Sequence, residues 1–158
     1  IEKVVLRSAA MSNVRTVTEI ADYAGSSSVT VSVDVKKSRF GRQQLLAPGT
    51  PLHGNSDWTG LLRRAIDAGA GEIILNAVDR DGTMSGMNTE LITTAARVAT
   101  VPLVAVGGVG SLDDITSGVR AGADAVGAGA FFVYHGPRRA VLITYPQYEE
   151  LTALLGAV

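Results

Sequence analysis

Short apolar runs alternate along this chain with longer stretches in which apolar residues recur at helical spacing. The apolar runs are rich in valine, isoleucine and alanine and predict β-strands. The expected strands cover residues 4–6, 29–33, 72–78, 103–106 and 125–128. The amphipathic stretches between and after them predict helices at about residues 13–24, 57–68, 88–99, 112–121 and 147–155. Residues 38–56 carry neither pattern and predict an irregular insert with room for a hairpin.

The order of these elements indicates the fold class. Each strand is followed by a helix, and strands that are apolar on both faces are typical of a parallel sheet. Two α/β architectures fit, an open doubly wound sheet or part of a TIM-type (βα)8 barrel. A complete barrel needs about 250 residues, whereas this chain has 158. We expect a single domain over residues 1–158. Its five βα units would fit the C-terminal part of a barrel whose first three βα units are missing, and the open doubly wound sheet stays the alternative.

The composition narrows the functional classes. Hydrophobic residues make up 46% of the chain and charged residues 18%, with a net charge of −1, which is typical of a folded globular domain. A nearly neutral chain argues against binding nucleic acid or a membrane through a charged face. The absence of cysteine excludes disulfides and thiolate metal sites. No run approaches the ~18 apolar residues of a membrane span, and we expect a cytoplasmic protein. We also expect no metal or cofactor.

Polar residues gather where the predicted strands end, which is the functional edge of a parallel α/β fold. Asp34 lies directly on a strand of apolar and small residues, where its carboxylate can face a cleft. Asp79 and Asp81 follow the third strand at once. The alternative is that such residues simply begin loops. Asp34 is the first candidate for a functional carboxylate.

Glycine turns follow the last two predicted strands, at Gly107-Gly108 and at Gly129. In a barrel, loops at these positions commonly bind phosphate through backbone N–H groups, and glycine lets the backbone approach the anion. Tight βα turns also need glycine, so a purely structural role is the alternative. The chain lacks a GxxxxGKS/T pattern and an opening GxGxxG pattern, which disfavours P-loop and Rossmann cofactor sites.

Strand alternation predicts which side chains share a face of the sheet. One face should carry the residues Lys3, Val5, Arg7, Thr30, Ser32, Asp34, Glu72, Ile74, Asn76 and Val78. If this face points into a barrel, the interior is partly polar. Lys3 and Glu72 then lie at the amino-end rim with opposite charges, where an ion-pair gate is plausible. The alternative is two exposed charges at strand starts.

Three motifs carry a resemblance to a known family: "EIILNAVDRDGTMSG", "VPLVAVGGVGSLDD" and "AGADAVGAGAFF". Together they resemble the cyclase subunit of imidazole glycerol phosphate synthase, as strands four to eight of its barrel. The resemblance implies a subunit that receives ammonia from a partner glutaminase. It also implies histidine biosynthesis, with conversion of a bis-phosphorylated ribulosyl-formimino-carboxamide ribonucleotide to imidazole glycerol phosphate and an aminoimidazole carboxamide ribotide.

The resemblance also implies roles for single residues. Asp34 matches one of two catalytic aspartates, and the other lies on a strand that precedes this chain in the family. Asp81 matches a further acid beside the substrate. The positions that match phosphate contacts are Gly82, Gly107, Gly108, Gly129 and Ala130, with Ser8 in a second phosphate site. Lys3 and Glu72 match two members of the charged gate for ammonia.

Some residues depart from the family pattern. Arg7 stands where a small amide is usual, and Ala130 replaces a usual serine. The tail "FFVYHGPRRAVLITYP" is similar to paralogues linked to amidation of surface-polysaccharide sugars. Three hypotheses therefore stay open: a cyclase, a paralogous ammonia-channelling subunit, and a non-catalytic phosphate-binding half-barrel. The tail also holds His135, Arg138 and Arg139, which either contact a partner or an anion or form a solvated basic loop. Trp58, Tyr145 and Tyr148 are expected to serve only in packing.

Overall fold

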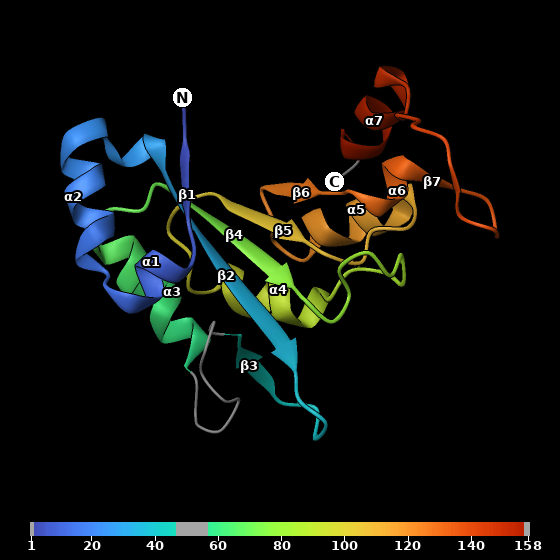
Figure 1. Cartoon of the computed structure of the whole chain (residues 1–158). Coiled ribbons are helices and arrows are strands. Elements are labelled where there is room, and N and C mark those ends of the chain that lie inside the picture. Colours follow the sequence, from blue (N-terminus) through green and yellow to red (C-terminus); the bar gives the residue numbers. More distant parts are fainter. Residues whose placement is uncertain (1, 47–56, 157–158) are drawn as a thin grey trace.

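A computed structural model describes residues 2–46 and 57–156 of the chain. Its centre is a parallel sheet of five strands in the order β1-β2-β4-β5-β6, which confirms the predicted α/β class (Figure 1). These strands are β1 (Val4–Leu6), β2 (Val29–Lys37), β4 (Glu72–Ala77), β5 (Leu103–Val106) and β6 (Ala125–Gly127). Neighbours along the chain are neighbours in the sheet, as in part of a barrel. A short strand, β3 (Gln43–Leu45), runs antiparallel to β2.

Helices follow the strands of the sheet. They are α1 (Ser8–Ser12), α2 (Arg15–Ala24), α3 (Trp58–Asp67), α4 (Thr89–Ala96), α5 (Leu112–Arg120), α6 (Ala130–Val133) and α7 (Tyr148–Leu155), with a 3-10 turn, η1 (Ser26–Ser28). Side-chain caps fix the starts of three of them. Asp57, Asn88 and Ser111 accept hydrogen bonds from backbone N–H groups in the first turns of α3, α4 and α5.

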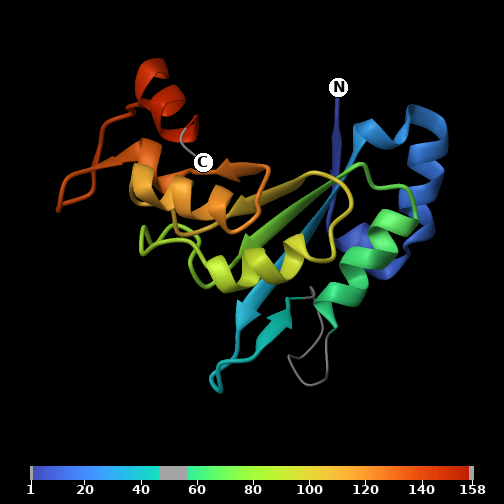
Figure 2. The same cartoon turned by 180° about the vertical axis from the view of Figure 1, so that it is seen from behind.

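The two faces of the sheet differ in what covers them. Figure 2 shows helices on one side of the strands, with α3 and α4 in front of the sheet. Side chains on that face are fully buried, including Val31, Val33, Ile73, Leu75 and Leu103. The alternate positions on the other face are only partly buried along β4. The hydrophobic core therefore lies on the helical side and leaves the opposite face for polar groups.

The structure corrects several predicted boundaries. Residues 8–12 form a helix that the sequence pattern did not predict. The next helix begins at Arg15 rather than at about residue 13, because the Asn13 carboxamide accepts a hydrogen bond from the Arg15 N–H (3.1 Å). Strand β2 continues to Lys37, since it pairs with β3 and β4 beyond Asp34. The part of the predicted insert at 47–56 lies outside the described residues.

The tail holds the largest departure from the predicted elements. Helix α6 is followed by a hairpin of two short strands, β7 (Tyr134–His135) and β8 (Ala140–Val141). Backbone hydrogen bonds from Leu142 to Val133 and from Thr144 to Phe132 attach its returning limb to α6. The hairpin extends away from the sheet in Figure 1. Pattern reasoning failed here because two-residue strands have no measurable periodicity.

Candidate functional site

A line of polar side chains crosses the less covered face of the sheet. It begins at the amino ends of the strands with Lys3 and Glu72 and ends near their carboxyl ends with Asp34 and Arg7. The strand register places Thr30 beside Glu72 and Asp34 beside Asn76. The residues expected from strand alternation to share a face therefore do so, and hydrogen bonds and ion pairs link most of the polar ones.

At the amino end, the Lys3 ammonium lies 2.5 Å from Glu72 Oε2. Lys3 belongs to the segment before β1, and Glu72 opens β4, so the pair spans the intervening strand β2. Thr30 on β2 donates a hydrogen bond to the other oxygen of Glu72 (3.1 Å). The Lys3 side chain is 48% exposed and that of Glu72 20% exposed. The carboxylate is thus held by two groups and the ammonium by one, because only Glu72 has a second partner among the described residues.

Further along the face, Asp34 is buried and surrounded by polar groups. Its Oδ2 lies 2.7 Å from Nε of Arg7. The Nε–H is not aligned with that oxygen, so the contact is an ion pair rather than a linear hydrogen bond. Ser32 and Asn76 each donate a long hydrogen bond of 3.4 Å to Oδ1. Both carboxylate oxygens therefore have partners.

Asn76 leaves one polar atom without a partner. Its Nδ2 donates to Asp34, whereas its Oδ1 is buried and accepts no hydrogen bond from any described residue. Buried acceptors of this kind are rare and cost roughly 1–3 kcal/mol. The site therefore has an unused acceptor beside Asp34, toward the carboxyl ends of the strands, which sequence reasoning did not single out.

The loop after β4 carries the second candidate acid. Asp81 is exposed, and its side chain has no partner among the described residues. No contact brings it to Asp34 within the described part of the chain. The base of the loop is fixed from inside, since the Arg80 guanidinium donates to the carbonyls of Gly86 (2.8 Å) and Met87 (3.0 Å).

The candidate phosphate-binding glycines fall into two groups. Gly107 and Gly108 have φ of +102° and +99°, and a Cβ on them would lie 2.7 Å from the Ala77 oxygen and 2.1 Å from the Gly86 oxygen. Backbone packing alone therefore requires glycine at both positions. Gly82 and Gly129 instead face open space. A phosphate role stays a prediction for all four.

The remaining candidates occupy helix starts. Ser8 is exposed and opens the five-residue helix α1, and Ala130 opens the four-residue helix α6. Within the described ranges, no group of three or more histidine, aspartate or glutamate residues could hold a metal ion. In the same part of the chain, no helix has the length and apolarity needed to cross a membrane.

The structure bears on the predicted packing roles of three aromatic residues and on the basic residues of the tail. Trp58 is buried in the core, as expected for packing, and the Tyr145 ring packs on Phe132 with centroids 5.1 Å apart. Both rings are largely exposed, Tyr145 at 70% and Tyr148 at 78%, so a packing role stays a prediction for Tyr148. Arg139 donates hydrogen bonds to the carbonyls of Thr83 (2.8 Å) and Gly82 (3.4 Å). The tail is therefore more than a solvated basic loop.

Comparison with known proteins fits this geometry. A sequence profile described as "Histidine biosynthesis protein" matches residues 1–137. The chain belongs to the HisF family of histidine biosynthesis proteins. Its sheet is accordingly part of a HisF-type barrel.

Individual relatives cover the same region. A protein of Nocardioides sp., named imidazole glycerol phosphate synthase subunit HisF, is 41% identical over 142 residues, which is 83% of this chain and 54% of the relative. A Leptospira interrogans protein that bears this name provisionally is 39% identical over 98% of this chain and 61% of its own length. A Pseudomonas aeruginosa protein with the provisional name hisF2 is 39% identical over 96% and 61%. The chain thus spans about three fifths of the length of the Leptospira and Pseudomonas relatives.

Proposed function

We propose that this chain is part of an ammonia-dependent cyclase and lyase subunit of the imidazole glycerol phosphate synthase type. A partner glutaminase supplies ammonia at the amino ends of the strands. The ammonia then reacts with a bis-phosphorylated ribulosyl-formimino-carboxamide ribonucleotide at their carboxyl ends. The observation that carries the proposal is the placement of two linked polar groups, one around Lys3–Glu72 and one around Arg7–Asp34, at the two ends of one face of the sheet.

The amino-end ion pair suits a gate for a small neutral molecule. Glu72 is held by Thr30, whereas Lys3 is half exposed and sits on a flexible stem. Movement of Lys3 alone would open the entrance and leave the carboxylate in place. Behind it, the free Oδ1 of Asn76 offers a hydrogen-bond acceptor to an N–H of ammonia. The face therefore supports passage of ammonia from one end of the strands to the other.

The carboxyl end supplies groups for proton transfer and phosphate binding. Ammonia addition, ring closure and cleavage each move protons, and a positioned carboxylate is a usual acid or base for such steps. Asp34 is the buried candidate and Asp81 the exposed one. The open turns at Gly82 and Gly129 leave room for an anion beside the backbone. Asp34 lies on β2, Asp81 and Gly82 follow β4, and Gly129 follows β6, so these groups are spread along the carboxyl edge of the sheet, as suits a long substrate with two phosphates.

The test is turnover of the ribulosyl-formimino substrate by the full-length protein with an ammonium salt as the nitrogen source. Wild-type protein should form imidazole glycerol phosphate. Asp34→Asn should lower kcat by roughly 10²–10⁴-fold, the usual contribution of general acid–base catalysis. Glu19→Gln, on the outer helix α2, serves as a control that keeps wild-type turnover. Absence of turnover by the wild type at high ammonia would exclude the cyclase function.

A second candidate is favoured by the Arg7–Asp34 contact. Arg7 occupies Oδ2 of Asp34, so the carboxylate can transfer a proton only after the ion pair opens. This arrangement suits a paralogous subunit that channels ammonia to a sugar-modifying partner for amidation of a surface polysaccharide. In that case the same assay gives no imidazole product. Glutamine-derived ammonia should still reach an acceptor enzyme when glutaminase, this subunit and the sugar-modifying partner are combined.

A further inference from the structure

The tail hairpin reaches back to the loop that follows β4. We define the strap as residues 134–141, which comprise β7, the connecting turn and β8. We propose that Arg139 is a positioning residue that holds the segment 81–83 in place from outside the barrel. The guanidinium bridges two successive carbonyls, those of Gly82 and Thr83. A planar guanidinium with paired donors suits such a bridge, and a lysine could make only part of it.

The chain next to the strap is held at helix α6. Its returning limb is hydrogen-bonded to Val133 and Phe132 of α6, and Tyr145 packs on the Phe132 ring. The backbone N–H of Arg139 donates to the Gly136 carbonyl (3.0 Å), which closes the turn. The turn holds Arg139 in the left-handed region at φ +49°, an uncommon conformation for a residue with a side chain. The turn therefore directs Arg139 toward the loop at some conformational cost.

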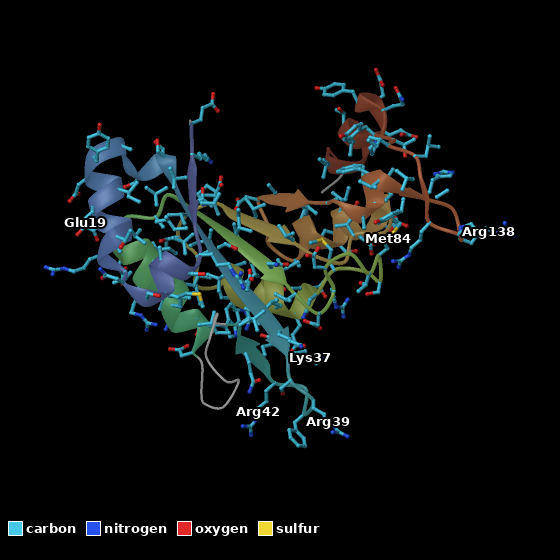
Figure 3. The ribbon with its side chains drawn as sticks, in the orientation of Figure 1. Glu19, Lys37, Arg39, Arg42, Met84 and Arg138 are labelled. Carbon is cyan, nitrogen blue, oxygen red and sulfur yellow. The ribbon has the colours of Figure 1, made fainter. Side chains whose placement is uncertain are left out.

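Side-chain packing between the strap and the loop after β4 is incomplete. A cavity of about 330 Å³ adjoins both: Met84 of the loop and Tyr134, His135 and Gly136 of the strap line it, together with Gly110 after β5 and residues that follow the strap. Figure 3 shows Met84 within this part of the molecule. Arg80 holds only the base of the loop, at Gly86 and Met87. Within the loop, Thr83 is hydrogen-bonded to the Arg80 carbonyl and to Ser85. The two Arg139 hydrogen bonds are the contacts among the described residues that tie the segment 81–83 to the strap.

The adjacent residue gives a matched control. Arg138 lies at the outer end of the hairpin and points away from the body of the molecule (Figure 3). It has the same charge and is also exposed, and it makes no hydrogen bond or ion pair with any described residue. A difference between variants of Arg138 and Arg139 therefore reports the bridge rather than the charge of the strap.

The first measurement is amide hydrogen exchange at Asp81 and Thr83 in the full-length protein. These N–H groups donate to the carbonyls of Ala77 and Arg80 within the loop. Arg139→Gly removes the guanidinium and suits the left-handed backbone, so it should raise their exchange rates about tenfold without disturbing the turn. Arg139→Lys should give an intermediate rise, and Arg138→Ala none. Wild-type exchange in Arg139→Gly, or an equal rise in Arg138→Ala, would overturn the proposal.

The second measurement concerns the site and rests on the function proposed above. If the segment at Gly82 binds a substrate phosphate, Arg139→Gly should raise KM for the bis-phosphorylated substrate about tenfold and change kcat by less than about twofold. A rise in KM with wild-type exchange would mean that Arg139 acts on the substrate directly, which contradicts positioning. If Arg139→Gly raises exchange but the wild-type protein turns over no substrate, the cyclase function is refuted and the positioning role stands.

Discussion

The two ion pairs on the polar face differ in reach and in surroundings. Lys3, just before β1, reaches across β2 to Glu72 on β4, whereas Arg7, just after β1, contacts Asp34 on the adjacent strand β2. Both cations are partly exposed, but the Asp34 side chain is 9% exposed against 20% for Glu72. An exposed lysine is a mobile point charge, and an arginine beside a buried carboxylate is hard to remove. The pair at the amino end is therefore the more exposed of the two, and the pair at the carboxyl end holds the more buried carboxylate.

The largest expected effect comes from breaking the buried pair. Arg7→Ala leaves the Asp34 carboxylate with only two long hydrogen bonds, and stranding a buried charge is costly. We expect a loss of about 1–3 kcal/mol in the free energy of unfolding, measured by urea denaturation. The double variant Arg7→Ala/Asp34→Asn should regain most of that loss, because it has no charge to strand. Failure of the double variant to regain stability would show that Arg7 acts through packing alone.

Breaking the exposed pair should have little effect on stability and a larger one on function. Lys3→Met keeps the length of the side chain without its charge and should change the free energy of unfolding by less than about 1 kcal/mol. Glutamine-driven turnover with the partner glutaminase should fall roughly tenfold, equivalent to about 1.4 kcal/mol. Turnover with added ammonium salt should remain unchanged. Equal losses with both nitrogen sources would argue against a gate.

The smallest expected effect lies on the helical side of the sheet, away from both pairs. Hydrogen bonds from the Gly60 N–H and the Thr59 hydroxyl, aided by Arg64 and Arg63, hold the pKa of Asp57 below its ordinary value of 3.8. A lowered pKa in the folded state stabilises the protein above the unfolded-state pKa, and this stabilisation is lost as the pH falls through the folded value. Asp57→Asn should therefore flatten the dependence of melting temperature on pH below about pH 4. An unchanged acid profile would contradict this.

The sequence predicted the face that these pairs share and made the Lys3–Glu72 ion pair plausible, but it did not predict the Arg7–Asp34 pair. Alternation along a strand is a local property, so the pattern alone could place Lys3 and Glu72 on one face. Their opposite charges follow directly from the residue types. Their direct contact, and the hydrogen bond that Thr30 donates to Glu72, depend on the register of three strands, which the packing of the whole sheet determines. The pairing of Arg7 with Asp34 has the same cause. Their functional roles stay predictions.

The unpredicted elements have a common physical origin. Helix α1 has no side-chain cap, and the strands of the tail hairpin have two residues each. Neither leaves a periodic signal, because tertiary contacts rather than local preference stabilise such short elements. The Arg139 bridge spans 56 residues to Thr83. A contact of that range has no signature in a single sequence.

The contrast between the glycine turns decides where this site can be redesigned. A library that varies Gly107 or Gly108 would consist mostly of misfolded members, since even a methyl group collides with a neighbouring carbonyl. Gly129 has φ of −118° and open surroundings, so it should accept any of the larger amino acids. Gly82 has space but φ of +70°, which favours asparagine and aspartate. New substrate contacts are therefore best introduced at these two positions.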